Sequence, residues 1–499
     1  MLSMHTSLSN PDLAPTRPEQ RTWSGWHIAA LWIGMAVCIP TYTLAAGMIE
    51  QGMAWWQAVL TVALGNVIVL IPMVLNGHPG AKYGIPFPVL MRASFGTVGA
   101  NVPAMARALV ACGWFGIQTW IGGAAIYQVL IALGWVGGAA ETARIAAHAG
   151  LAGALGITGW QLACFLAFWL VNLHFVWHGM DSIKWLAAWS APFLIAAGLA
   201  LLGWALWRVA AMPESGGVGA LFRQGSRFET HGGFWAVFVP QLTAMVGFWA
   251  TLSLNIPDFT RYAKSQKAQV WGQAAGLPTT MTLFCFIGIA VTQATVIIFG
   301  KAVWDPVELV GKLGSVTVII IALVALSVAT LSTNIAANVV SPANDFSNLS
   351  PRRISFRMGG MITAVIGILM CPWYLYNNLG AYIFTWLIGY SALLGPIAGI
   401  MLCDYYVIRR ARLNVDDLYR ADGEYAYGGS GWNWRALVAF GVAVLPNLPG
   451  FINAATKRAV FPPVFDDIYI AAWFVGLGIG AVVYWALMAG TGGRESRAA

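Results

Sequence analysis

The stretch Val328–Pro342, VATLSTNIAANVVSP, decides how the rest of the chain is interpreted. It belongs to an uncharged run, Leu313–Asn344, that can cross a bilayer, since about 20 apolar residues span the hydrocarbon. Polar groups at this depth are costly unless they face a cavity, another helix or a ligand. The second half of the run is nevertheless dense in such groups: Thr330, Ser332, Thr333, Asn334 and Asn338.

These hydroxyls and amides have two interpretations. Ser332 and Thr333 are adjacent, so one cation can take both hydroxyl oxygens, and Asn338 follows about a turn and a half later on the same helix. Alternatively, the same groups hydrogen-bond neighbouring helices and bind nothing. Other segments of the chain favour the first interpretation.

Composition identifies the class of protein. The 499 residues are 59% hydrophobic and only 9% charged, with a mean hydropathy of +0.69, whereas soluble domains carry roughly a quarter charged residues. We therefore expect a polytopic, all-α membrane protein. The net charge of +8 does not indicate nucleic-acid binding, because it is explained by where the basic residues lie along the chain.

Nearly uncharged segments predict twelve transmembrane helices, and the basic residues predict their orientation. Most of the 27 Lys and Arg fall in segments on the side of the N-terminus, so the positive-inside rule places both termini in the cytoplasm. The first 26 residues lack an apolar core, so no cleavable signal peptide is expected. The expected membrane is a bacterial-type inner (plasma) membrane. The expected helices are 27–48, 56–76, 103–134, 158–178, 185–207, 235–255, 275–299, 314–340, 359–376, 380–403, 435–453 and 468–490.

Two of these helices are expected to be interrupted halfway across. Ala36–Thr41 places Pro40 near the middle of the first helix, where a proline removes a backbone hydrogen bond. Gly247–Asp258 breaks the sixth helix in the same way. Irregular backbone at this depth survives only where it lines a cavity or is covered by protein. Breaks five helices apart are typical of two inverted five-helix repeats, and the freed carbonyls before Pro40 are candidate ion ligands.

The third helix carries a candidate site for a planar ligand. Trp114 and Gln118 are four residues apart and share a helix face. A ring can stack on the indole and hydrogen-bond the amide. Because the chain has 25 tryptophans, a buried tryptophan in a helix interface is the favoured explanation of Trp114 taken alone. The segment 77–102, which is rich in Gly and Pro and lies between the second and third helices, is expected to be a structured loop.

Other chemistry finds little support. None of the 19 Asp and Glu is centred in an expected helix, which favours a hard cation such as sodium, bound by neutral oxygens, over a proton relay. No catalytic motif is present, so the chain is not expected to be an enzyme. His174 and His178 have metal-ligand spacing but no third ligand nearby. The six cysteines are expected to be small buried hydrophobic residues.

Six sequence motifs resemble those of the nucleobase–cation symporter family, the carriers of nucleobases, hydantoins and allantoin. The resemblance extends from Asn10 to about Tyr419, nearly the whole chain. The motifs are LWIGM (31–35), NGHPGAKYGIPFPVLMRASFG (76–96), GWFGIQTWIGG (113–123), NIPDFTRYAK (255–264), STNIAANVVSP (332–342) and CDYYVIRR (403–410).

The resemblance implies the leucine-transporter-type fold, a five-plus-five inverted repeat, with two extra C-terminal helices. It divides the chain into a tail (1–26), a transport core (27–403, with repeats at about 27–207 and 235–403), a linker (404–434), helices 11 and 12 (435–490) and a second tail (491–499). The implied activity is secondary active symport by alternating access, in the lipid bilayer and by a monomer.

The resemblance also implies site residues. The substrate ring would lie between Trp114 and Trp249, with Gln118 and Asn338 bonding its amides. Sodium would be held by the carbonyls of Gly34, Val37 and Ala329 and the hydroxyls of Ser332 and Thr333.

Two residues depart from a hydantoin-carrying member of the family. Cys38 replaces a glutamine and Phe248 replaces a glycine, so the site loses one amide and becomes narrower. We therefore expect a small planar ring of the uracil, hydantoin or dihydropyrimidine type. Allantoin, cytosine or a purine base is the alternative within the family, as is cation-independent or proton-coupled uptake. A membrane receptor or sensor for the same ligands is the alternative outside it.

Overall fold

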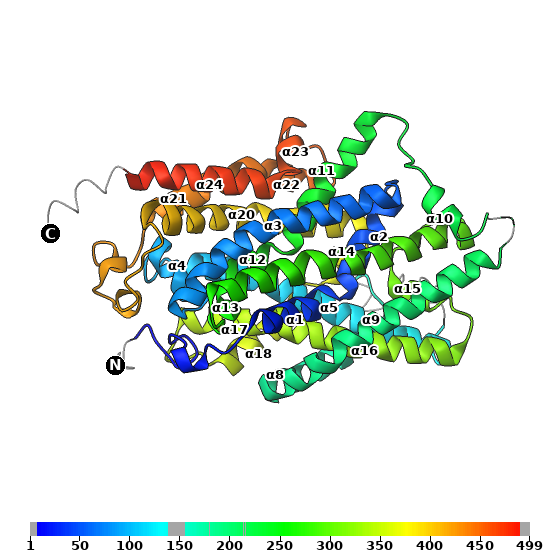
Figure 1. Cartoon of the computed structure of the whole chain (residues 1–499), viewed down its shortest axis with the longest axis horizontal. Helices are drawn as coiled ribbons and strands as arrows, with labels where there is room; N and C mark the ends of the chain where they lie inside the picture. Colours follow the sequence, from blue (N-terminus) through cyan, green and yellow to red (C-terminus); the bar gives the residue numbers. More distant parts are fainter. Residues whose placement is uncertain (1–6, 138–154, 179, 213, 215, 490–499) are drawn as a thin grey trace.

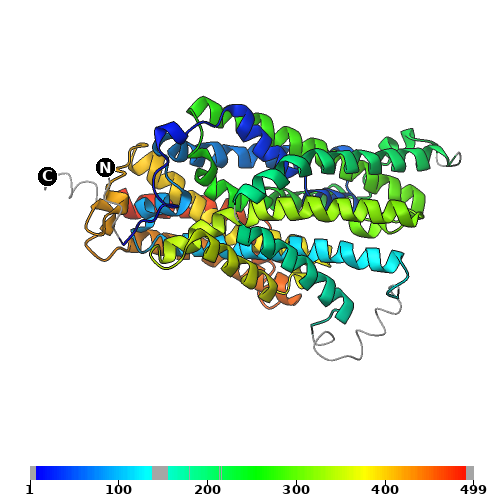
Figure 2. The same ribbon diagram turned by 90° about the horizontal axis from the view of Figure 1, so that it is seen from below.

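The computed structural model describes residues 7–137, 155–178, 180–212, 214 and 216–489. Within these ranges the regular structure is helical, and the one isolated β-bridge joins Trp23 and Ala263. Eight described helices are long and apolar enough to cross a membrane, or nine when a bent pair counts as one span. The long helices run side by side along one axis (Figures 1 and 2). The expected all-α membrane class is confirmed.

Each of the twelve expected ranges coincides with a helix or a broken helix. In chain order these are α1 (Gly25–Ala36) with α2 (Ile39–Glu50), α3 (Trp55–Tyr83), α5 (Asn101–Ala132), α8 (Gly159–His178), α9 (Met180–Ala210), α11 (His231–Phe248) with α12 (Ala250–Asn255), α14 (Gln266–Phe299), α16 (Val316–Asn338) with α17 (Val340–Leu349), α18 (Phe356–Leu369) with α19 (Trp373–Tyr376), η3 (Ala381–Leu387) with α20 (Ile388–Leu402) and η4 (Cys403–Ile408), α21 (Trp434–Val444) with α22 (Leu448–Thr456), and α24 (Ala472–Ala489).

The first helix breaks where the sequence predicts. The axes of α1 and α2 differ by 60°, and Cys38 between them is extended, with φ −145° and ψ 162°. Pro40 lies in the first turn of α2, where its missing N–H leaves no helical bond unmade. Proline therefore starts the second half-helix instead of kinking a continuous one.

The sixth helix breaks at Trp249, which has φ −100° and ψ 3° between α11 and α12. A further short helix, α13 (Pro257–Thr260), follows α12 directly. The expected interruption at 247–258 is confirmed. The glycine before this break, Gly247, leaves no room for a Cβ, because the Ser391 hydroxyl and Leu387 carbonyl lie against it.

Several boundaries differ from the sequence-based expectation. The segment 77–102 is not a loop throughout: α3 continues to Tyr83 over Pro79, and α4 (Phe87–Phe95) follows. The eighth span continues through α17 to Leu349, and the tenth through η4 to Ile408. The ninth helix breaks at Cys371, whose φ is +48° and which is half-buried, so it is not a core cysteine. The eleventh breaks at a 3₁₀ turn, Leu445–Asn447.

The spans pack into two groups with α9 between them, and three helices flank these groups. One group contains α1, α2, α3, α11, α12, α13 and α14, and the other contains α5, α8, α16, α17 and α18. The helices α20, α21 and α24 pack against one another beside them. Because the broken first and sixth spans belong to the first group and the polar eighth span to the second, the candidate site lies where the two groups meet.

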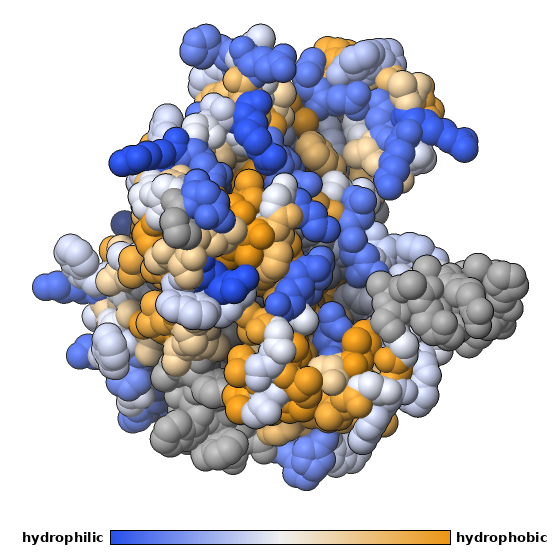
Figure 3. Space-filling model, turned by 90° about the vertical axis from the view of Figure 1, so that its right-hand side faces the viewer, coloured by the Kyte–Doolittle hydropathy of each residue, from blue (hydrophilic) through white to orange (hydrophobic). Residues whose placement is uncertain are grey.

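The described chain starts and finishes at the same end of the bundle, called here the terminal end (Figure 1). The segment before α1 is not a free tail. Leu13 is fully buried, the Asp12 carbonyl accepts from Arg261 at 2.9 Å and the Leu13 carbonyl accepts from Tyr419 at 2.7 Å. The opposite end of the bundle carries hydrophilic side chains around hydrophobic patches (Figure 3).

Candidate functional site

Trp114 on α5 lies at the centre of a cluster of aromatic rings. Its ring centroid is 5.1 Å from Phe248, 6.0 Å from Trp386, 6.2 Å from Tyr382 and 6.4 Å from Tyr390, all edge-on. These neighbours come from the break in the sixth span and from the tenth span. The three residues of the tenth span were not predicted from the sequence. The uncharged, aromatic-rich run at 381–390 could have indicated them.

The family resemblance implies that a substrate ring lies between Trp114 and Trp249, but in the structure Trp249 contacts other residues. Its indole N–H donates to the side-chain oxygen of Asn66 on α3 at 2.9 Å, and its ring meets Trp32 edge-on at 5.2 Å. Phe248 contacts both indoles, with its centroid 4.9 Å from Trp249 and 5.1 Å from Trp114. The phenyl ring therefore lies between the two tryptophans.

Gln118 lies one helical turn beyond Trp114 on α5. Its side chain is buried, and its Oε1 has no hydrogen-bond partner among the described residues. Leaving such an oxygen unsatisfied costs about 1–3 kcal/mol. A ligand N–H would satisfy it, so this oxygen marks a candidate binding position beside the aromatic cluster around Trp114.

Asn338 belongs to a chain of amides between helices. Its Nδ2 donates to Oδ1 of Asn334 at 3.0 Å, and Nδ2 of Asn334 lies within 3.2 Å of the Thr119 hydroxyl and 3.0 Å of Asn172 Oδ1. The amides thus join α16 to α5 and α8. Asn334 thus makes the hydrogen bonds between helices that were one of the two interpretations of this segment. Asn338 is the last member of this series of hydrogen-bonded amides.

The proposed ion ligands come from the break in the first span and from α16, which packs against α1. The Cys38 N–H, which would bond Gly34 in a continuous helix, donates to the Ala36 carbonyl at 3.0 Å. Val37 and Ala329 belong to one buried cluster. Ser332 and Thr333 follow on α16 and are both buried. The structure therefore places both contributing segments against each other, with open space around Gly34.

Cys38 lies at the break itself. It is buried, and its Sγ is 3.2 Å from the Thr41 hydroxyl. The histidine pair gains no third ligand: no group of three His, Cys, Asp or Glu close enough to hold a metal is found in the described part of the chain.

Two polar contacts lie beside the aromatic cluster around Trp114, on the side opposite the termini. The Tyr382 hydroxyl donates to the Pro40 carbonyl at 3.4 Å, and the Thr43 and Tyr376 hydroxyls are 2.8 Å apart. Both contacts join α2 to the segment that contains α19 and η3. Towards the terminal end, the Asn255 side chain of α12 hydrogen-bonds the Ser341 hydroxyl of α17.

The chain is similar in sequence to known permeases. A family profile described as "Permease for cytosine/purines, uracil, thiamine, allantoin" matches residues 15–476. The chain is 46% identical over 492 residues to the purine-uracil permease NCS1 of Arabidopsis thaliana, covering 98% of this chain and 79% of the relative. It is 39% identical over 486 residues to the allantoin permease of Bacillus subtilis, covering 96% and 93%.

The chain belongs to the nucleobase–cation symporter family. The solved structure of Mhp1, a member of this family, in its inward-facing conformation superposes with a TM-score of 0.76 at 27% identity, over 98% of this chain and 95% of Mhp1. A closed conformation of Mhp1 with bromovinylhydantoin bound gives 0.73. The leucine-transporter-type fold and the multi-pass membrane location are therefore confirmed. Like its relatives, this symporter-family member is a transporter and not an enzyme.

Proposed function

We propose that the protein is a secondary active symporter that imports a small planar nucleobase-like heterocycle together with sodium, by alternating access. The observation that supports the substrate class is the buried, unpartnered Oε1 of Gln118 one turn from Trp114. A ring that stacks on an indole and donates an N–H from a lactam or imide fits both groups.

The packing of aromatic rings around Trp114 favours a small ring as substrate. Phe248 fills the space between Trp114 and Trp249, and Cys38 offers no amide. We therefore propose uracil, hydantoin or a dihydropyrimidine as substrate. Allantoin or a purine base is the alternative, and relatives named for purine, uracil and allantoin support keeping both sets in the first experiment.

Sodium is proposed as the coupling ion. Its ligands would be the carbonyls of Gly34, Val37 and Ala329 and the hydroxyls of Ser332 and Thr333, all neutral oxygens of the kind that bind a hard cation without a carboxylate. By joining α1 to α16, the ion would stabilise the outward-open state, so that each ligand raises the affinity of the other by the same factor.

We further propose that residues 27–403 form the transport core, with inverted repeats at about 27–207 and 235–403. The linker 404–434 and the helices of 435–490 would be additions to it. Both termini would be cytoplasmic in a bacterial-type inner membrane, so that the terminal end faces the cytoplasm, and the protein would act as a monomer.

Uptake into proteoliposomes tests the proposal. Labelled uracil, hydantoin, dihydrouracil, allantoin and adenine are supplied outside, with either sodium or choline and with or without a protonophore. We expect one of the small rings to accumulate chemically intact. This uptake should require sodium and should be unaffected by the protonophore. Uptake that is unchanged when choline replaces sodium would refute sodium coupling. Uptake that is abolished by the protonophore would indicate that protons are the coupling ion. Binding without accumulation would identify a receptor or sensor instead.

A further inference from the structure

An apolar crevice lies on the outer surface between the second, tenth and twelfth spans. It has a volume of about 490 Å³, and its lining includes Leu75, Leu402, Val407, Leu477, Val482 and Trp485. Val407, Val482 and Trp485 are between 51% and 63% exposed, so the crevice opens away from the protein core. In a membrane-spanning chain this surface faces the hydrocarbon of the bilayer.

A polar pocket of about 790 Å³ adjoins the crevice towards the terminal end. It is lined by residues such as Arg409, Arg412, Asn414, Glu424 and Tyr427. Residues close together in sequence line the two cavities on two elements: Val407 lines the crevice and Ile408 the pocket, and on α24 Trp485 lines the crevice while Met488, about one turn further, lines the pocket. The crevice and the pocket are therefore neighbours, and the two are called here the composite site.

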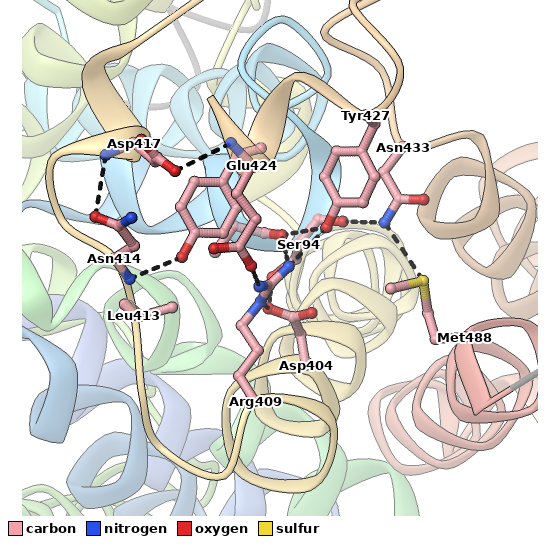
Figure 4. Close-up of polar contacts among 12 residues, drawn as sticks. Ser94, Asp404, Arg409, Leu413, Asn414, Asp417, Glu424, Tyr427, Asn433 and Met488 are labelled. Carbon is pink, nitrogen blue, oxygen red and sulfur yellow. Dashed lines mark hydrogen bonds and ion pairs between the residues drawn. The ribbon is translucent and has the colours of Figure 1, made fainter. Parts of the chain in front are cut away.

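Arg409 is already neutralised inside this pocket (Figure 4). Its guanidinium is 2.9 Å from Asp404 Oδ2 and 2.6 Å from Glu424 Oε1. Burial opposes the charge on Arg409, but Asp404 and the phenol oxygens nearby outweigh that cost and raise its pKa. Glu424 and Asp404 thus both face Arg409, so these three groups carry a net charge of −1, and the three basic residues described next bring the whole cluster to +2.

Three basic residues converge on the turn after Ile408. Lys82 Nζ, at the end of α3, donates to the Ala411 carbonyl at 2.8 Å. Arg410 and Arg412 flank Ala411, both are exposed, and neither side chain makes a hydrogen bond or ion pair with a described residue. Arg410 and Ala411 have φ values of 50° and 58°, a left-handed conformation that costs a non-glycine residue free energy and is concentrated at functional sites.

We propose that this composite site binds one phospholipid with an anionic headgroup. One acyl chain would lie along Val407 and Trp485 in the crevice, and the phosphate would be bound by Lys82, Arg410 and Arg412 at its polar end. Charge complementarity favours an anionic lipid over a zwitterionic one, because basic groups at the cytoplasmic surface attract anionic headgroups. The apolar crevice favours a lipid over a soluble phosphate.

The test is native mass spectrometry and thermal unfolding of the purified full-length protein in detergent. The probes are dioleoyl phosphatidylglycerol, dioleoyl phosphatidylcholine and glycerol 3-phosphate, which carries the anionic group without acyl chains. We expect saturable retention of phosphatidylglycerol and a raised Tm, with far weaker effects of the other two. Equal retention of phosphatidylcholine, or equal binding of glycerol 3-phosphate, would overturn the proposal.

The variant R410Q/R412Q should weaken phosphatidylglycerol binding about ten- to thirty-fold. The matched control is R352Q/R353Q, which removes the same two charges from another exposed segment at the terminal end and should leave binding unchanged. Ala481→Trp, which fills the apolar crevice, should reduce retention of the lipid. If R410Q/R412Q and R352Q/R353Q weaken binding equally, general surface charge explains the effect and the site is refuted. Tm measured without lipid shows whether each variant is folded.

Discussion

Arg107 and Asp345 form a buried ion pair, with Nη1 of Arg107 3.2 Å from Oδ2 of Asp345 and neither side chain more than 1% exposed. The pair joins α5 to α17, beside the hydrogen bond of Asn255 to Ser341 that connects the two groups of helices. Asp345 lies near the end of the eighth span, which continues through α17 to Leu349, and it is fully buried.

Breaking this pair should destabilise the protein. Asp345→Asn leaves the Arg107 charge buried without its partner, so the free energy of unfolding should fall by about 3–5 kcal/mol. Thermal or denaturant unfolding in detergent measures the change. Glu308→Gln is the matched control, since it removes an ion pair with Lys312 in which the side chains are 49% and 37% exposed. The control should lower the free energy of unfolding by at most about 1 kcal/mol. Equal decreases in the two variants would contradict a special contribution of the buried pair.

Gln118→Leu should separate binding from stability. The variant removes the unpartnered oxygen, so Tm should stay the same or rise, while the affinity for the transported ring should fall at least about tenfold through loss of the ligand hydrogen bond. Equilibrium binding and a thermal scan on the same sample give both values. Gln128→Leu, at a half-buried position further along α5, should leave affinity unchanged. Wild-type affinity in Gln118→Leu would exclude Gln118 from the site.

Phe248→Gly should change the preference for substrates. Removing the ring that contacts both Trp114 and Trp249 leaves space beside the two indoles, so 5-substituted hydantoins and purines should compete better and uracil worse. Competition against a labelled substrate measures the shift, and Phe248→Leu, which keeps most of the bulk, should retain the original ranking. An unchanged ranking in Phe248→Gly would mean that the phenyl ring does not limit the site. Because large-to-small changes in a core cost about 3–5 kcal/mol, folding of the glycine variant is checked by its Tm.

Ser332→Ala with Thr333→Val should raise the sodium concentration required for half-maximal uptake about tenfold, because two hydroxyl ligands are lost. Uptake is measured across a sodium series at saturating substrate. Thr330→Val is the control, since it removes a buried hydroxyl without a described partner from the same helix and lies outside the proposed ligand set. An identical sodium dependence in the double variant would remove these hydroxyls from the ion site.

Much of the fold follows from local sequence. Long uncharged runs have to be helical in lipid, because every backbone group must be satisfied within its own segment, and the twelve expected ranges coincide with helices. The breaks in the first and sixth spans were also predictable, since Pro40 and the Gly247–Asp258 segment act on the adjacent backbone. Boundaries such as Leu349 and Ile408 were missed because the helices continue through polar residues that packing, and not hydropathy, accommodates.

The sequence by itself determined the membrane class, the position of the breaks and the segments that carry the candidate ligands, because hydropathy and proline act over a few residues. Only the tertiary structure decided which rings surround Trp114, that Phe248 lies between the two indoles, and that Gln118 retains an unpartnered oxygen. It also decided that Arg107 and Asp345 are buried together. These relationships join residues far apart in the chain, and they depend on how the helices pack, which no local pattern specifies.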